Sequence, residues 1–330
     1  MGTLQGVRRG VDFYRAQNDM FNSNPGRWNT YSPLTYRQPL LTYLWLALGS
    51  GAVIGFVYGV LAGISMLAAY SATTPLLRPV SAILTPFALG VVYTAAILHP
   101  PRVLYTEMWA APMVVIAGAL CVLVLENPEL AYSNSRRAKA LSALGATSAL
   151  FAMATREPSA IPVLIMLAAL SFDRVARARR LWIPWAGSLL VWAALYAVHA
   201  ARVQAVSQGD PAPPITQGGL LASYFHPGLA FLSACVRWVS TTPVLVPVVV
   251  LFCMMAVAGA WTLRKTRLRV LVGGTTLGLL ALLVLTGTPG TYQDGSYTGY
   301  WGFLFLPPII AWAALGLRLV PGSSLSRGTS

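Results

Sequence analysis

The sequence predicts an all-α protein, a polytopic transmembrane helical bundle of about nine spans. Further helices are expected in the membrane–water interface on the outer side. Three observations support this. Hydrophobic residues make up 56% of the 330 residues and charged residues only 10%, whereas a soluble domain carries roughly 25% charged residues. The apolar residues form continuous stretches of about 20 residues, which is the length that crosses a bilayer as a helix. The loops between them also sort by charge, as the loops of membrane proteins do.

Nine apolar stretches lie between charged or Pro- and Gly-rich breaks. In order, they cover residues 43–71, 80–99, 105–125, 139–155, 158–173, 182–202, 242–263, 268–287 and 300–319. The first stretch is long, so residues 39–48 are expected to form a short interfacial helix before the crossing. The fourth and fifth are only ~17 residues each, near the lower limit for a span, and predict a hairpin with its tip at residues 155–159.

Charge sets the predicted orientation. Alternating loops place fourteen basic residues on one side and four on the other, and the richer side is expected to be cytoplasmic. Residues 219–239 are also apolar, but counting them as a crossing would move the basic group at 264–269 outside. We therefore expect them to form an amphipathic helix in the outer interface. The net charge of +14 comes mostly from such short loops, which argues against nucleic-acid binding.

The predicted organisation follows from this map. Residues 1–40 form an outer N-terminal segment, residues 41–320 the bundle with an outer loop and interfacial helix at 203–241, and residues 321–330 a cytoplasmic tail. The protein is expected to be a multi-pass protein of the plasma membrane, with its N-terminus outside and its C-terminus in the cytoplasm. Residues 1–40 are rich in arginine and difficult to export without a helix before them. Either this segment is exported against its charge or a first helix is missing from this chain; we expect the missing helix, which a membrane partner would supply.

Two acids on the outer side are candidate functional residues. Asp12 stands beside Phe13 and Tyr14, where partial burial would raise its pKa and make it a base. The alternative is a solvated loop aspartate. Glu107 lies at the outer start of the third span, where it would face any cavity that the outer loops enclose. The helix dipole is a sufficient structural explanation for an acid at that position.

A basic residue and an aromatic loop complete the outer features. Arg156, at the tip of the short hairpin, needs an anion, and its forked donors suit phosphate. Glu157 beside it and a lipid headgroup are alternative partners. The last outer loop contains Tyr300 and Trp301, which are suited to stacking on a sugar ring or to an interfacial aromatic belt.

No metal site or soluble nucleotide site is predicted. The histidines show no paired spacing and the three cysteines, Cys121, Cys235 and Cys253, show no ligand spacing, so no protein-built metal cage and no cofactor are expected. A divalent metal is not indicated. Phosphate-loop, nucleophile-elbow and dinucleotide fingerprints are not present in the sequence.

Taken in order, several motifs resemble the C-type integral-membrane glycosyltransferases. This superfamily includes protein O-mannosyltransferases, lipid A aminoarabinose transferases and bacterial polyprenyl-phosphate mannosyltransferases. The matching segments are Val11-Asp12-Phe13-Tyr14, Tyr36-Arg37-Gln38-Pro39-Leu40-Leu41, Tyr105-Thr106-Glu107, Thr155-Arg156-Glu157-Pro158 and Tyr300-Trp301-Gly302. The resemblance implies an inverting hexosyl or pentosyl transferase that moves a sugar from a polyprenyl-phosphate donor to an acceptor on the outer face. Its implied partners are the polyprenyl-phosphate-linked sugar and membrane lipids.

The resemblance also implies roles for individual residues. Asp12 would be the catalytic base that takes the proton of the acceptor hydroxyl, and Arg156 and Arg37 would hold the donor phosphate. The residues expected to position the substrate are Glu107, Tyr14, Asp19 and Tyr300. The chain departs from the superfamily in having no helix before the catalytic loop and no second acid adjacent to Asp12.

Two other classes of function remain open. A transporter or lipid flippase would also be a polytopic bundle, but it often shows internal repeats and charged residues at mid-depth. Here the sequence has no convincing repeat, and its polar residues cluster towards one face. A non-catalytic membrane subunit of a larger complex would explain the lack of a first helix.

Overall fold

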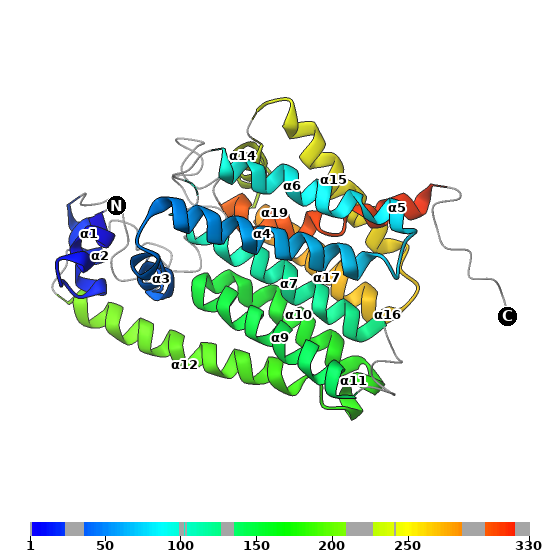
Figure 1. Cartoon of the computed structure of the whole chain (residues 1–330), viewed down its shortest axis with the longest axis horizontal. Coiled ribbons are helices and arrows are strands. Elements are labelled where there is room, and N and C mark those ends of the chain that lie inside the picture. Colours follow the sequence, from blue (N-terminus) through cyan, green and yellow to red (C-terminus); the bar gives the residue numbers. More distant parts are fainter. Residues whose placement is uncertain are drawn as a thin grey trace.

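The computed structural model describes residues 2–23, 36–98, 102, 104–126, 135–208, 227–240, 242–285 and 301–320. Within these ranges all regular structure is helical and no strand occurs. The prediction of an all-α bundle is therefore confirmed. Figure 1 shows the longer helices running side by side along the long axis of the molecule.

The centre of the bundle is α7 (Thr106–Glu126), which is apolar on all sides and buried along almost its whole length. A helix of that kind is stable only when other helices surround it. It packs against α4 (Gly51–Thr73) on one side and α9 (Ser135–Thr155) on the other, as Figure 1 shows. Alanine and glycine along α7 allow these neighbours to approach closely.

The remaining helices surround this core. Between α4 and α7 come α5 (Pro79–Ala82) and α6 (Leu84–Ile97). After α9 follow η2 (Glu157–Ser159), α10 (Ala160–Phe172), α11 (Arg174–Ala178), α12 (Ile183–Val206), α14 (Ala230–Val239), α15 (Leu245–Trp261), α16 (Thr266–Leu268), η3 (Arg269–Gly273), α17 (Gly274–Leu285), α19 (Gly302–Ile310) and η5 (Ala313–Leu319).

Five stretches are long and apolar enough to cross a membrane, which makes this a multi-pass membrane protein. They are Gly51–Thr73, Thr106–Glu126, Ile183–Val206, Thr266–Leu285 and Gly302–Leu319. Helices also occupy the other four predicted spans, but the apolar helices there are shorter or, in α9, less apolar. The prediction that nine helices cross the membrane is therefore not confirmed and stays a prediction.

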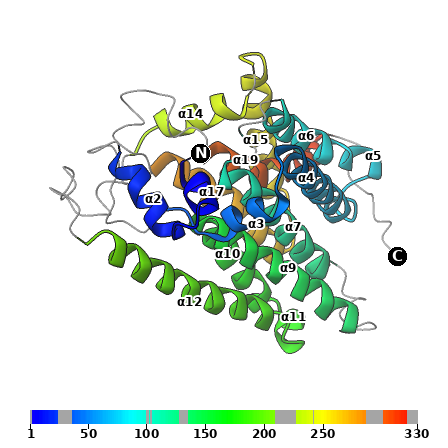
Figure 2. The same ribbon diagram turned by 60° about the vertical axis from the view of Figure 1, so that its left-hand side comes forward.

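The N-terminal segment is folded against one end of the bundle. It forms α1 (Gly2–Arg8), α2 (Phe13–Asn22) and α3 (Leu40–Leu48), the last at the place predicted for a short helix. The aromatic side chains of α2 form a small second apolar cluster with Tyr36 and with Val203 near the end of α12. Figure 2 shows α2 lying across the end of the bundle, above that end of α12.

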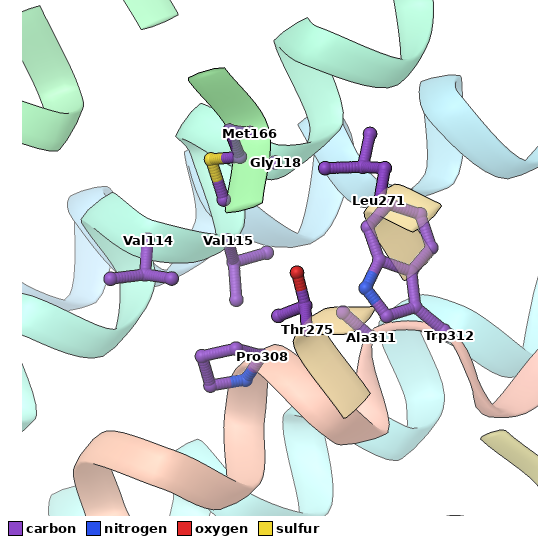
Figure 3. A pocket seen from close by; sticks show the side chains of 9 residues that line it. All are labelled: Val114, Val115, Gly118, Met166, Leu271, Thr275, Pro308, Ala311 and Trp312. Atoms are coloured by element: carbon purple, nitrogen blue, oxygen red, sulfur yellow. The ribbon is translucent and has the colours of Figure 1, made fainter. Parts of the chain in front are cut away.

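The middle of the bundle is closely packed. A void of about 10 Å³ lies between α7, α10, α17 and α19, and Figure 3 shows that its lining is apolar apart from the Thr275 hydroxyl and the indole nitrogen of Trp312. The Thr275 hydroxyl is buried and has no hydrogen-bond partner among the described residues. A volume of this size is at the limit for one water molecule, so this void is too small for a sugar or a lipid headgroup.

The predicted outer interfacial helix is found in part. Of residues 219–239, the structure describes 227–239, and α14 occupies Ala230–Val239. The helix is amphipathic, with Phe231, Cys235 and Val239 buried along one face. Residues 219–226 of the predicted helix lie outside the described residues. The location of α14 in a membrane interface stays a prediction.

Candidate functional site

Glu107 is the centre of a buried charge cluster at the end of the bundle that carries α1–α3. It lies in the first turn of α7, where the helix dipole favours a carboxylate, and its side chain is 0% exposed. Its Oε1 lies 2.5 Å from Arg156 Nη2 and 3.7 Å from Arg37 Nη1. The Thr106 hydroxyl donates to Oε2 at 3.1 Å. A carboxylate removed from water requires such partners because an unpaired buried charge is strongly unfavourable.

Arg156 connects the two helices of the predicted hairpin. It follows α9 directly, in an extended conformation that ends the helix, and Glu157-Pro158-Ser159 forms the turn into α10. Its side chain is only 1% exposed. The guanidinium carbon lies 4.3 Å from the ring centroid of Trp301, so Arg156 contacts a carboxylate as well as an aromatic face. Arg156 is therefore enclosed by protein.

Arg37 is the solvent-accessible cation of the cluster, with 29% of its side chain exposed. Its backbone N–H donates to Gln17 Oε1 of α2 at 3.1 Å. The next residue, Gln38, donates through Nε2 to Glu157 Oε1 at 3.1 Å. The short segment that carries Arg37 is thus attached to α2 on one side and to the α9–α10 turn on the other. This attachment fixes where the exposed guanidinium lies.

Asp12 has a different set of contacts. Its Oδ1 accepts from the backbone N–H groups of Tyr14 and Arg15, which caps the start of α2. Its Oδ2 forms an ion pair with Arg202 of α12 at 2.8 Å, and 43% of its side chain is exposed. Asp12 is linked to the Glu107 cluster through α2, because α2 carries the Gln17 that holds Arg37. The structure therefore gives Asp12 a capping role that the sequence reasoning did not consider.

Tyr14 joins the N-terminal segment to α12. Its hydroxyl lies 3.1 Å from His199 Nδ1, in hydrogen-bond contact, and the guanidinium of Arg202 lies over its ring. Burial, more than the charges nearby, raises the pKa of Tyr14 to about 12. The phenol therefore keeps its proton at physiological pH. It supports the position of α2 as a hydrogen-bonding group rather than as an anion.

Comparison with solved structures identifies the architecture. Three structures of the oligosaccharyltransferase of Archaeoglobus fulgidus match 93% of this chain, with TM-scores of 0.52 to 0.54 and sequence identities of 14 to 15%. The bundle has an oligosaccharyltransferase-like fold. At this identity the likeness establishes the fold alone, and the chain spans less than half of those relatives, 45 to 46% of their length. No protein-family model and no curated protein sequence matches this chain.

The matched structures differ in what they contain. One is the apo form, one is a complex with an inhibitory peptide and a dolichol-phosphate, and one is tethered to an acceptor peptide that contains the NVT sequon. The likeness is one of fold, and the resemblance to the C-type glycosyltransferases stays a prediction from the sequence. The three branches named from the sequence remain predictions.

Within this oligosaccharyltransferase-like fold, the predicted site residues separate into groups. Glu107, Arg156 and Arg37 are brought together, whereas Asp12 and Tyr14 contact α12. Asp19 is exposed on α2 and has no side-chain partner among the described residues, and Tyr300 lies outside those residues. In the described part of the chain, no group of three or more His, Cys, Asp or Glu side chains is placed to hold a metal.

Several residues of this end were missed by the sequence reasoning. Gln17 and Gln38 hold the Arg37 segment, and His199 and Arg202 hold α2 on α12. For His199 a signal was present, since it is a polar side chain within an apolar span. For the glutamines no signal was present, because their roles depend on contacts between distant parts of the chain.

Proposed function

We propose that this chain is a membrane glycosyltransferase that moves a sugar from a polyprenyl-phosphate donor to an acceptor on the outer face of the plasma membrane. The observation that carries the proposal is the buried Glu107–Arg156 pair with the exposed Arg37 beside it, in an oligosaccharyltransferase-like fold. A structure with that fold is described with a dolichol-phosphate, which is a lipid phosphate of the proposed kind. These three side chains carry two positive charges and one negative charge, and Glu157 of the adjoining turn, which accepts from Gln38, adds a second negative charge.

The two arginines have different roles in the proposed site. Arg37 contacts the donor phosphate, because it is the cation that reaches solvent, and its guanidinium offers forked donors to phosphate oxygens. Arg156 is buried behind Glu107 and does not reach the lipid directly. It holds Glu107 in place through their ion pair. Glu107 fixes the position of Arg37.

In the proposed chemical step, Asp12 acts as the general base. The acceptor hydroxyl gives its proton to the Asp12 carboxylate while its oxygen forms a bond to the anomeric carbon of the sugar. The bond from that carbon to the phosphate oxygen breaks, and its electron pair leaves with the lipid phosphate, whose charge Arg37 stabilises. Attack from the side opposite the leaving group inverts the configuration. The exposed side of Asp12 makes it accessible to an acceptor. Tyr14, Asp19 and Tyr300 position the substrates.

Binding of dolichyl phosphate by the purified chain in detergent tests this proposal. Arg37→Gln removes the exposed cation and is expected to weaken binding about tenfold or more, since a hydrogen bond to a charged group contributes about 1.5–3 kcal/mol. Arg9→Gln is the matched control. Arg9 is exposed at the same end of the bundle and forms no side-chain hydrogen bond or ion pair among the described residues. Equal affinities for the two variants would contradict the assignment of the phosphate site.

A further inference from the structure

A second charged site lies at the opposite end of the bundle. A hollow of about 730 Å³ opens between the end of α10 and the loop that joins α15 to α17, and it is lined by residues 172–175, 265–267 and Val270. Figure 1 shows α11 and α16, which border this hollow, at the end of the molecule away from α1–α3. The hollow is therefore separate from the Glu107 cluster.

The walls of the hollow carry more cations than carboxylates. Arg267 is ion-paired with Asp173, and Lys265 Nζ lies 2.9 Å from Glu126 Oε2. Arg174 is exposed, and its side chain has no hydrogen bond or ion pair with any described residue. One positive charge thus remains after both pairs are counted. The two pairs hold Lys265 and Arg267 in place, and Arg174 is the cation on the wall of the hollow that no described carboxylate pairs with.

The hollow also has an apolar side. The Phe172 side chain, at the last residue of α10, is 76% exposed, and Val270 lines the wall across from it. A large exposed aromatic residue at the end of an apolar helix, next to basic side chains, suits the boundary between lipid headgroups and acyl chains. A soluble anion would make no favourable contact with this apolar wall.

We propose that this hollow binds the phosphate headgroup of an anionic phospholipid from the leaflet on that side of the membrane. Arg174 contacts the phosphate, while Lys265 and Arg267, each paired with a carboxylate, form the wall beside it. Phe172 and Val270 contact the first carbons of the acyl chains. Such a lipid joins the ends of α10 and α16, which lie next to each other in the bundle. The site does not depend on the proposed transferase activity.

Native mass spectrometry of the whole chain in detergent tests the proposal. The affinity of the first bound phosphatidylglycerol is measured, with phosphatidylcholine as the zwitterionic comparison. Arg174→Gln is expected to weaken phosphatidylglycerol binding about fivefold, because a basic residue beside an anionic headgroup contributes roughly that factor. Arg174→Lys keeps the charge and is expected to restore most of the affinity.

Arg136→Gln is the matched control. Arg136 is exposed near the start of α9, at the same end of the bundle, and does not line the hollow. The substitution therefore removes the same charge from a position outside the proposed site. It is expected to leave the first phosphatidylglycerol bound with unchanged affinity. Equal weakening by both variants would overturn the proposal in favour of general surface charge. Displacement of the lipid by an equal concentration of inorganic phosphate would also overturn it, because the occupant would then be a soluble anion.

Discussion

The pairing of Glu107 with Arg156 shows what the apolar bundle demands of a charged residue. Both side chains are almost completely buried, and their closest atoms are 2.5 Å apart. Removing one partner of such a pair leaves an uncompensated charge, at a cost of about 3–5 kcal/mol. The ion pair therefore stabilises the fold as well as contributing charge at this end of the bundle. Arg37, which is partly exposed, is the member that we propose contacts the substrate.

Asp12 is the residue whose role is tested best by two different substitutions. Asparagine caps a helix about as well as aspartate, so Asp12→Asn keeps the start of α2 but removes the proposed base. We expect sugar transfer from a radiolabelled polyprenyl-phosphate donor in membranes to fall by a factor of about 10² to 10⁴. Binding of dolichyl phosphate by this variant is expected to stay near that of the wild type.

Asp12→Ala serves as the comparison, because it removes both the cap and the base. Loss of the cap costs about 1 kcal/mol and disturbs the helix that holds Arg37 through Gln17. Lipid binding should therefore weaken in this variant but not in Asp12→Asn. Normal transfer by Asp12→Asn would show that the carboxylate only positions α2, and another residue would have to act as the base.

At the scale of elements, the sequence predicts the apolar helices, including α3, but α1 and α2 were not predicted. Each of the nine predicted stretches contains a helix, because continuous apolar sequence in a bilayer satisfies its backbone only as a helix or a closed barrel. The segment before residue 40 lacks such a constraint. Asp12 followed by Phe13, Gln17 and Phe21 at helical spacing is the pattern of a capped amphipathic helix. That pattern was read as a loop carrying a base.

The contacts between elements were the part of the site that sequence could not supply. Glu107 and Arg156 were singled out separately, one for the helix dipole and one for its place in a hairpin turn. Their contact depends on the packing of α7 against α9, which is a property of the folded bundle. The same holds for Arg37, whose place is set by side chains from α2 and from the α9–α10 turn.

The close approach of α15 and η5 predicts that a larger side chain between them lowers stability. A Cβ atom on Gly259 of α15 would overlap the backbone of Leu315 and Gly316, and one on Gly316 would lie 2.7 Å from the Met255 carbonyl oxygen. Gly259→Ala is expected to lower the free energy of unfolding by about 1–3 kcal/mol because the helices must move apart. Thermal unfolding in detergent measures this change.

Gly187 in α12 provides the control for that measurement. A Cβ atom there would have nothing within 4 Å. Gly187→Ala is expected to be neutral or to stabilise the chain by up to about 1 kcal/mol, because alanine favours the helix. If the two variants unfold at the same temperature, α15 and η5 are not packed as closely as the structure places them.

At the scale of the whole molecule, the charge distribution predicts which end faces which compartment. The Glu107 cluster and the basic hollow lie at opposite ends of the bundle, and α12 runs between these ends (Figure 1). Cysteine labelling tests the orientation with little background, because Cys121, Cys235 and Cys253 are all buried. An impermeant maleimide added to intact cells is expected to label Gln204→Cys, near the outer end of α12.

Arg177→Cys, in the basic turn before α12, is the partner variant. Both positions are exposed on the protein surface. The second is expected to react only after the cells are opened, since positively charged loops are retained in the cytoplasm. Labelling of Arg177→Cys in intact cells, with protection of Gln204→Cys, would reverse the orientation. The proposed site would then face the cytoplasm.

We propose that a lipid phosphate binds beside Arg37 and Glu107. Photo-crosslinking measures this most directly, using a dolichyl phosphate analogue with a photoreactive group next to the phosphate and the whole chain in phosphatidylcholine liposomes. Mass spectrometry of the digested protein is expected to find the adduct on peptides that contain Arg37 or the start of α7, and Arg37→Gln is expected to reduce it. Adducts confined to residues 172–175 and 265–267, or spread evenly over the helices, would show that the lipid phosphate does not bind at Arg37 and Glu107.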